Sequence, residues 1–160
     1  VCDTLKCFGQ KWKGTCPAIP FVHPQNRRDD HSVAFLTSEY QMIRKKLEEI
    51  LQVEITDQKI SESIILYNEY RSVMREFTGL AADYPLTITP TVRHKIIKAG
   101  YFMEKAEYIA IMKQINSGLR LRKPESSEDR KVVGTGLTLE PGGLLEIFEQ
   151  FHLQICASSH

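Results

Sequence analysis

The sequence predicts an α/β protein: a mainly helical middle segment, followed by the start of a parallel-sheet domain. Apolar residues recur at three- and four-residue steps across residues 33–118, which is the period of amphipathic helices. After residue 130 the pattern changes to short apolar runs bounded by glycines, which is typical of buried strands. Residues 119–130 are basic, then acidic, and contain Pro124. We therefore expect a linker there, between a helical segment and a second domain at residues 131–160.

The composition is that of an ordinary globular protein. Of the 160 residues, 42% are hydrophobic and 26% are charged, and the formal net charge is +1. So small a charge provides no field that would attract nucleic acid or an anionic membrane. No apolar run approaches the roughly 20 residues of a spanning helix, and no secretory signal is visible. We expect a cytoplasmic protein with neither nucleic acid nor membrane among its partners.

The first helix is expected at residues 33–51. Residues 1–32 are irregular and rich in Cys, Pro, His and Arg. Ser32 then offers a hydroxyl that suits an N-cap. The apolar stripe that follows predicts an amphipathic helix with a charged back. Its members are Phe35, Leu36, Tyr40, Ile43, Leu47, Ile50 and Leu51.

Three more helices are expected before residue 118. Thr56 is the predicted cap of the first of them, and Gly79 marks its end. Thr89 precedes a proline, which is a cap followed by proline at the first helical position. Gly100 predicts a break before the last helix, which Gly118 ends. The three apolar stripes are Ile60, Ile64, Tyr67, Met74 and Phe77; Val92, Ile96, Ile97 and Phe102; and Ala106, Ile109, Met112 and Ile115.

Residues 131–160 predict a strand–helix–strand unit. A buried strand at 131–136 ends in a glycine turn, a helix follows at 144–151, and a second strand follows at 152–156. This order is a βαβ unit, which implies a parallel sheet of the flavodoxin-like or Rossmann-like kind. Two strands do not form a stable sheet of that kind. We therefore expect the chain to be a fragment that stops where a second α/β domain begins.

The four cysteines point to a reducing compartment, because their spacing is unlike that of a small disulfide scaffold. Thiolates suit zinc and iron–sulfur sites, but the compact paired spacing of a zinc ribbon is absent. From spacing alone, metal ligation and free or buried thiols both remain open. The cysteines are Cys2, Cys7, Cys16 and Cys156.

Two further patterns each allow a functional and a structural interpretation. Asn68 and Arg71 lie one turn apart on one helix face. They either orient a substrate or cofactor loop or bond a neighbouring backbone across a domain interface, and the second is preferred. The glycines at 134–136 and 141–143 either bind a phosphate or form a tight strand-to-helix turn. Neither the dinucleotide nor the Walker spacing is present, which favours the turn.

Several segments, in order along the chain, together resemble one family of enzymes. Cys2-Asp3-Thr4 is similar to a cluster-binding segment, and a proline-bearing loop at 19–24 precedes an acidic-aromatic helix start at 35–40. The helix after Thr56 contains Tyr67-Asn68-Glu69-Tyr70-Arg71, similar to a Tyr-Asn-x-x-Arg motif. Residues 132–136 are similar to the strand that opens the second domain. The order of these short motifs resembles the 2-hydroxyacyl-CoA dehydratase family, D-component type.

The resemblance implies a lyase that acts on an acyl-CoA. Such enzymes are heterodimers of two related subunits, each with two α/β domains and a 4Fe-4S cluster held by three cysteines. The resemblance implies that residues 1–32 are the remnant of an N-terminal cluster-binding α/β domain. An ATP-dependent activator protein supplies one electron, and a ketyl radical of the hydroxyacyl-CoA loses its hydroxyl. Cys2 matches a cluster ligand, and therefore a metal-site residue, of the full-length protein. Cys156 is a weaker candidate, because Ser158-Ser159 stand where the family has two acids and Cys156 precedes that pair.

These observations leave more than one functional hypothesis. The first is a fragment of a dehydratase subunit that is inactive alone, because its partner subunit and the rest of its sheet are absent. The second is a non-enzymatic helical module that binds a partner through residues 33–118. A related acyl-CoA reductase or double-cluster protein of the same superfamily is the third. Iron and sulfide in the full-length protein would distinguish the second from the other two.

Overall fold

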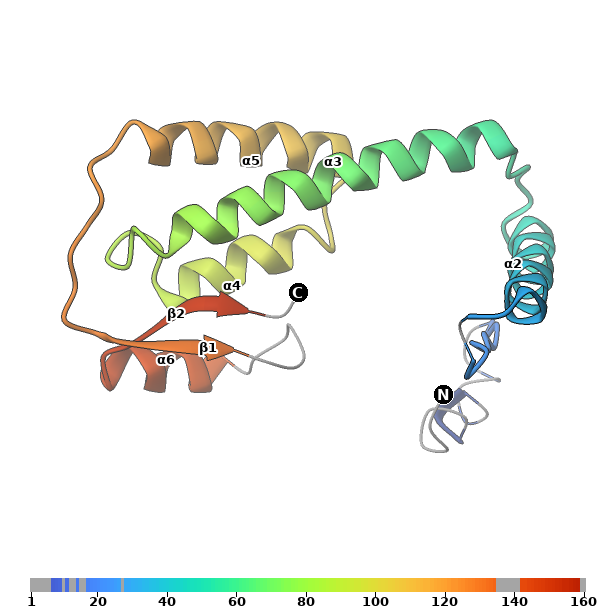
Figure 1. Ribbon diagram of the computed structural model, residues 1–160, viewed down its shortest axis with the longest axis horizontal. Helices are drawn as coiled ribbons and strands as arrows, with labels where there is room; N and C mark the ends of the chain where they lie inside the picture. The colour runs from blue at the N-terminus through green and yellow to red at the C-terminus, as the bar shows by residue number, and fades with distance from the viewer. Residues whose placement is uncertain are drawn as a thin grey trace. The chain divides into compact units, whose positions relative to one another are not determined.

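The computed structural model describes residues 7–9, 11, 14, 17–26, 28–134 and 142–158. Two compact units make up the chain, Val1–Ile60 and Ser61–His160, and each is described by itself. Helices together with a small parallel sheet, whose two strands are connected by a helix, confirm the α/β class (Figure 1). The elements in chain order are α2 (Asp30–Leu51), α3 (Asp57–Ala81), α4 (Pro90–Ala99), α5 (Lys105–Arg120), β1 (Arg130–Gly134), α6 (Gly142–Gln150) and β2 (Leu153–Ser158).

The first long helix, α2, begins earlier than the sequence predicts. Its N-cap is Asp29, whose carboxylate accepts a hydrogen bond from the backbone amide of Ser32 at 2.7 Å. The prediction of Ser32 as the cap was wrong: Ser32 is the donor. A carboxylate is favoured there because it meets the positive end of the helix dipole as well as an unpaired amide. Hydrogen bonds from the backbone amide and from the side chain of Ser32 lower the pKa of Asp29.

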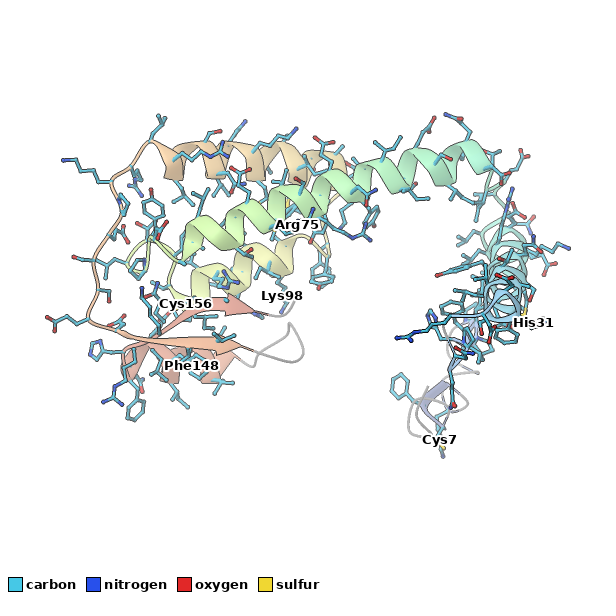
Figure 2. All side chains as sticks on the ribbon, viewed as in Figure 1. Cys7, His31, Arg75, Lys98, Phe148 and Cys156 are labelled. Atoms are coloured by element: carbon cyan, nitrogen blue, oxygen red, sulfur yellow. The ribbon has the colours of Figure 1, made fainter. Side chains whose placement is uncertain are left out.

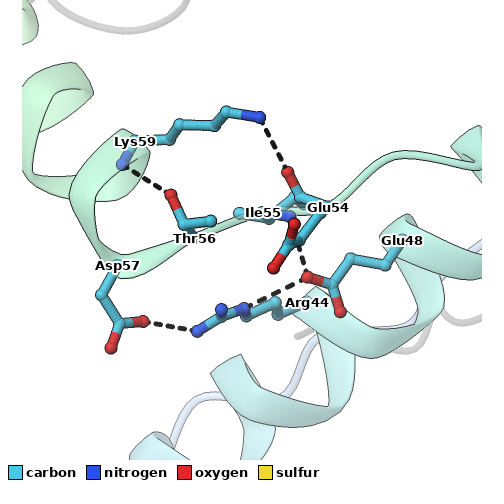
Figure 3. Close-up of polar contacts among 7 residues, drawn as sticks. All are labelled: Arg44, Glu48, Glu54, Ile55, Thr56, Asp57 and Lys59. Atoms are coloured by element: carbon cyan, nitrogen blue, oxygen red, sulfur yellow. Dashed lines mark hydrogen bonds and ion pairs between the residues drawn. The ribbon is translucent and has the colours of Figure 1, made fainter.

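Arg44 joins α2 to the start of α3 (Figure 3). Its guanidinium lies 2.6 Å from a carboxylate oxygen of Asp57 and 3.4 Å from one of Glu48. The hydrogen bond with Asp57 is the largest cause of a raised pKa of Arg44, and the contact with Glu48 adds to it. Glu48 also accepts the backbone amide of Ile55 at 2.8 Å, which fixes the turn between the helices. Because the Asp57 side chain is 90% exposed, we expect the ion pair to set geometry more than stability.

The caps of α3 and α4 are those that the sequence predicts. The hydroxyl of Thr56 accepts the amide of Lys59 at 3.2 Å. Thr89 is the N-cap of α4, with Pro90 in the first helical position. Both depend on residues within one turn of the helix start, which is why sequence alone was sufficient.

Two helices continue past the glycines expected to end them. The helix α3 runs two residues beyond Gly79, and α5 runs two residues beyond Gly118. The last turns bury Ala81 and Leu119 in the core. Burial of those side chains offsets the conformational cost of a helical glycine, which is only about 1 kcal/mol.

The core of the second unit lies between α3, the α3–α4 turn, α4 and α5. Tyr84, in that turn, is 3% exposed, and its one hydroxyl proton is shared between the carbonyls of Leu119, at 2.5 Å, and Arg122, at 3.0 Å. The chain leaving α5 is thereby bound to the turn before α4. The buried cluster contains Val73, Phe77, Ala81, Tyr84, Ile88, Tyr108, Ile109, Met112 and Leu119.

The stretch predicted as a linker lies against this turn. The backbone amide of Glu125 donates to the Asp83 carbonyl at 2.8 Å. Its carboxylate accepts the amides of Leu86 at 2.7 Å and Thr87 at 3.0 Å, and the Thr87 hydroxyl donates to it as well. The segment between α5 and β1, residues 121–129, is therefore held against this turn through Glu125; we call it the strap.

The strand–helix–strand order is confirmed, but the prediction that the first strand is buried was wrong: β1 has no buried residue, and Val133 is 68% exposed. With only β2 beside it among the described residues, β1 has nothing there to cover its side chains. The strands β1 and β2 are parallel, Val132 pairs with Ile155, and the register shifts after Val132. The helix α6 packs against α4 and β2 (Figure 1). Glu149 of α6 accepts the Thr91 amide of α4 at 3.1 Å. Of the glycine segments predicted at 134–136 and 141–143, Gly134 ends β1 and Gly142 begins α6, and residues 135–141 lie outside the described part of the chain.

Within the described part of the chain, no helix is long and apolar enough to cross a membrane.

Candidate functional site

The described residues do not bring a set of metal ligands together. Cys2, the predicted cluster ligand, and Cys16 lie outside the described part of the chain. Cys7 is an exposed free thiol (Figure 2). Among the described residues, no group of three His, Cys, Asp or Glu side chains is placed to hold a metal ion. An iron–sulfur cluster needs several thiolates, so the described residues alone do not fit one.

Cys156 is a free thiol on β2. It is partly buried beside the buried Ile155, and its sulfur lies 3.7 Å from the Gln154 carbonyl (Figure 2). A half-buried cysteine on a strand behaves as a small apolar residue with a weak S–H donor. Its role as a ligand stays a prediction.

The Tyr-Asn-x-x-Arg segment lies on α3, and its polar members bond to each other. The Arg71 guanidinium donates to the Asn68 side-chain oxygen at 3.0 Å, at an exposed position. The preferred expectation, a bond to neighbouring backbone across a domain interface, is not confirmed: among the described residues the Arg71 side chain bonds only to Asn68. The amide instead holds the guanidinium in one orientation at the surface of α3.

Beside this pair, Lys105 of α5 lies over two tyrosine rings of α3. Its ammonium nitrogen is 5.6 Å from the centre of the Tyr67 ring and 5.2 Å from that of Tyr70, within the range of cation–π attraction. The ammonium also donates to the Gly100 carbonyl at the end of α4. One cation therefore connects three helices.

Gly100 lies in close contact with two tyrosine side chains. A Cβ on Gly100 would lie 3.1 Å from the Tyr70 hydroxyl and 3.1 Å from the Tyr108 ring. Tyr108 in turn donates its hydroxyl to the Ile96 carbonyl at 2.7 Å. Burial raises the pKa of Tyr108, and Tyr70 adds to that effect. Burial, with Tyr101 and Tyr67 nearby, also raises the pKa of Tyr70, so both phenols stay neutral at physiological pH.

The sequence did not indicate Lys105 as part of a site. Lys105 and Tyr67 are far apart in the chain and share no motif. The available signal was Gly100, which was interpreted as a helix break. A glycine at a helix end next to aromatic residues is also compatible with close packing, but only the folded arrangement identifies its neighbours.

The fold and this site define a class: an α/β protein whose helical segment carries an aromatic and cationic cluster and is followed in the chain by a βαβ unit. The chain belongs to the family described as 2-hydroxyglutaryl-CoA dehydratase, D-component, whose model matches residues 1–160.

Individual relatives agree with this assignment. The chain is 45% identical to lactoyl-CoA dehydratase subunit beta of Anaerotignum propionicum over 154 residues, or 96% of this chain and 41% of the relative. It is 37% identical to the (R)-phenyllactyl-CoA dehydratase beta subunit of Clostridium sporogenes, with 96% of this chain and 42% of the relative covered. It is 33% identical to (R)-2-hydroxyglutaryl-CoA dehydratase, subunit beta, of Acidaminococcus fermentans, with 98% of this chain and 42% of the relative covered. The chain thus spans about two fifths of the length of these relatives.

Proposed function

We propose that this chain is part of the beta-type subunit of a 2-hydroxyacyl-CoA dehydratase. The similarity to three relatives named as dehydratase beta subunits supports the proposal, because it extends over 96–98% of the chain at 33–45% identity. A beta subunit requires a second subunit, so the proposed enzyme is a heterodimer. Its proposed location is cytoplasmic.

The proposed reaction removes water from a 2-hydroxyacyl-CoA. The C2–O bond and a C3–H bond break, a C2–C3 double bond forms, and water leaves, so the net reaction neither oxidises nor reduces the substrate. The single electron supplied by an ATP-dependent activator is therefore recovered at the end of each turnover. We propose a 4Fe-4S cluster in the complete subunit with Cys2 among its ligands, and Cys156 as the weaker candidate. No step is assigned to that cluster, because the described residues do not provide its ligand set.

A second candidate is an acyl-CoA reductase of the same superfamily. The chain is 24% identical to one of the subunits of benzoyl-CoA reductase from Thauera aromatica, with 98% of this chain covered. The lower identity makes this the second candidate.

The test uses the complete subunit, produced anaerobically together with its second subunit and supplied with the activator and ATP. Lactoyl-CoA, phenyllactyl-CoA and 2-hydroxyglutaryl-CoA are offered separately, and benzoyl-CoA is the comparison substrate. We expect one of the hydroxyacyl thioesters to lose one water, seen by mass spectrometry, only when ATP is present. Reduction of benzoyl-CoA without any dehydration would support the reductase instead. No turnover and no bound iron or sulfide would leave the partner-binding module as the remaining hypothesis.

A further inference from the structure

One flank of α3 presents cations that form no ion pair with a carboxylate among the described residues. Tyr67, Arg71 and Arg75 follow each other at four-residue steps, so they share one face of the helix, and Arg75 is labelled on α3 in Figure 2. Lys105 of α5 adjoins this face, over the Tyr67 ring. We call these four residues the α3 basic–aromatic surface.

Other cations of the protein are paired differently. Lys113 lies 2.5 Å from Glu69, and Arg120 lies 2.6 Å from Glu76. On the α3 basic–aromatic surface, by contrast, the oxygens that bind the cations are neutral: the Asn68 amide for Arg71 and the Gly100 carbonyl for Lys105. Within the described part of the chain, no carboxylate lies within ion-pair distance of Arg71, Arg75 or Lys105. Their charge is therefore available to an anion.

The aromatic part of the surface is accessible and held in place. Tyr67 is 43% exposed, and its ring centre lies 6.3 Å from that of Tyr70, which packs against Tyr108 in the core. Tyr101, in the turn after α4, is 60% exposed. Any nucleobase can stack on such an aromatic ring, because every base has a planar π-face.

We propose that the α3 basic–aromatic surface binds the phosphorylated adenosine of CoA. This inference rests on the proposed function, in which the substrate is an acyl-CoA. CoA carries a 3′-phosphate, a diphosphate and an adenine, and so combines the two features that complement this surface. The fork of N–H donors on an arginine matches phosphate oxygens, and Asn68 already holds that of Arg71 in one orientation.

The first experiment measures binding of adenosine 3′,5′-bisphosphate to the complete two-subunit protein by calorimetry. We expect Arg71→Gln and Arg75→Gln each to weaken binding on the order of tenfold, the effect of losing one charge-assisted hydrogen bond. Both side chains are exposed, so the variants should fold normally. The control is Lys113→Gln, whose cation is paired with Glu69; it should bind like the unaltered protein.

Two variants of one residue test stacking. Tyr67→Phe keeps the ring and should keep the affinity, whereas Tyr67→Leu should weaken it by about tenfold. Equal affinities for the two variants would remove the adenine from the proposal. Binding of ATP as tightly as the bisphosphate would show a general nucleotide surface and overturn the assignment to CoA.

A second readout separates this proposal from the proposed function. Arg71→Gln should raise the KM for the hydroxyacyl-CoA while leaving kcat, and the KM for the corresponding acyl-pantetheine, unchanged. If dehydration occurs but Arg71→Gln and Arg75→Gln leave both KM values unchanged, the surface is wrongly assigned and the enzyme is not. If no dehydration occurs but the bisphosphate binds and both variants weaken it, the surface stands and the proposed reaction fails.

Discussion

Glu125 binds both the backbone amide and the hydroxyl of Thr87, 38 residues earlier in the chain, with the amide at 3.0 Å. Burial raises the pKa of the Glu125 carboxyl, but the hydrogen bonds from Thr87 and Leu86 outweigh this effect and hold the pKa below its ordinary value. The same carboxylate thus closes the strap between α5 and β1.

Replacing Glu125 with Gln should destabilise the fold by about 1–2 kcal/mol at pH 7, because the bonds to a charged acceptor are weakened. A carboxyl whose pKa is lowered by folding contributes stability above its unfolded pKa and loses it as the pH falls through the folded pKa. The difference between the two proteins should therefore shrink below about pH 4.5, the ordinary value. Urea unfolding at pH 7 and pH 4 measures this.

The matched control is Glu128→Gln, at an exposed position three residues further on, which should change stability little at either pH. A difference between Glu125→Gln and the unaltered protein that stays constant with pH would contradict the role of the Glu125 charge.

A methyl group at Gly100 should destabilise the protein by about 1–3 kcal/mol, the usual cost of overpacking. It would meet the Tyr70 hydroxyl and the Tyr108 ring, each at 3.1 Å. Gly118→Ala is the comparison, since nothing lies within 4 Å of the added atom. That variant should gain about 0.5–1 kcal/mol because alanine favours the helix. Thermal melts of both variants measure these changes in stability. If Gly100→Ala left the melting temperature unchanged, the close packing of Gly100 against Tyr70 and Tyr108 would be contradicted.

Removing the hydroxyl of Tyr84 should lower the free energy of unfolding by about 1–3 kcal/mol, because the Leu119 and Arg122 carbonyls lose the donor that they share. The measurement is the urea midpoint of Tyr84→Phe. Tyr40→Phe, at an exposed position, should leave the midpoint where it is. If both variants behaved alike, the Tyr84 hydroxyl would not hold the end of α5.

In the complete subunit, Cys2→Ala should lower bound iron and sulfide after anaerobic purification, since clusters are held by thiolates. Cys7, an exposed free thiol, supplies the control: Cys7→Ala should keep the full iron content. Loss of iron in Cys7→Ala with retention in Cys2→Ala would transfer the ligand role to Cys7. Iron retained in both would remove this segment from the cluster site.

Much of the local structure followed from short stretches of sequence. Thr89 and Pro90 predicted the start of α4 because a cap acts within one turn. The change from helical periodicity to short apolar runs likewise predicted β1, α6 and β2. Asp29 was missed as the cap of α2 because Ser32 is an equally good candidate by residue type, and only the backbone angles of the cap distinguish them.

The tertiary structure decided what depends on neighbours distant in sequence. Lys105 meets Tyr67 and Tyr70 only when α5 packs along α3, and Glu125 meets Thr87 only when the strap folds back over the turn before α4. The sequence by itself determined which segments are helices or strands, because periodicity and caps are local. Which side chains those segments bring together is a property of their packing, since each contact closes a loop of many residues whose ends carry no shared local signal.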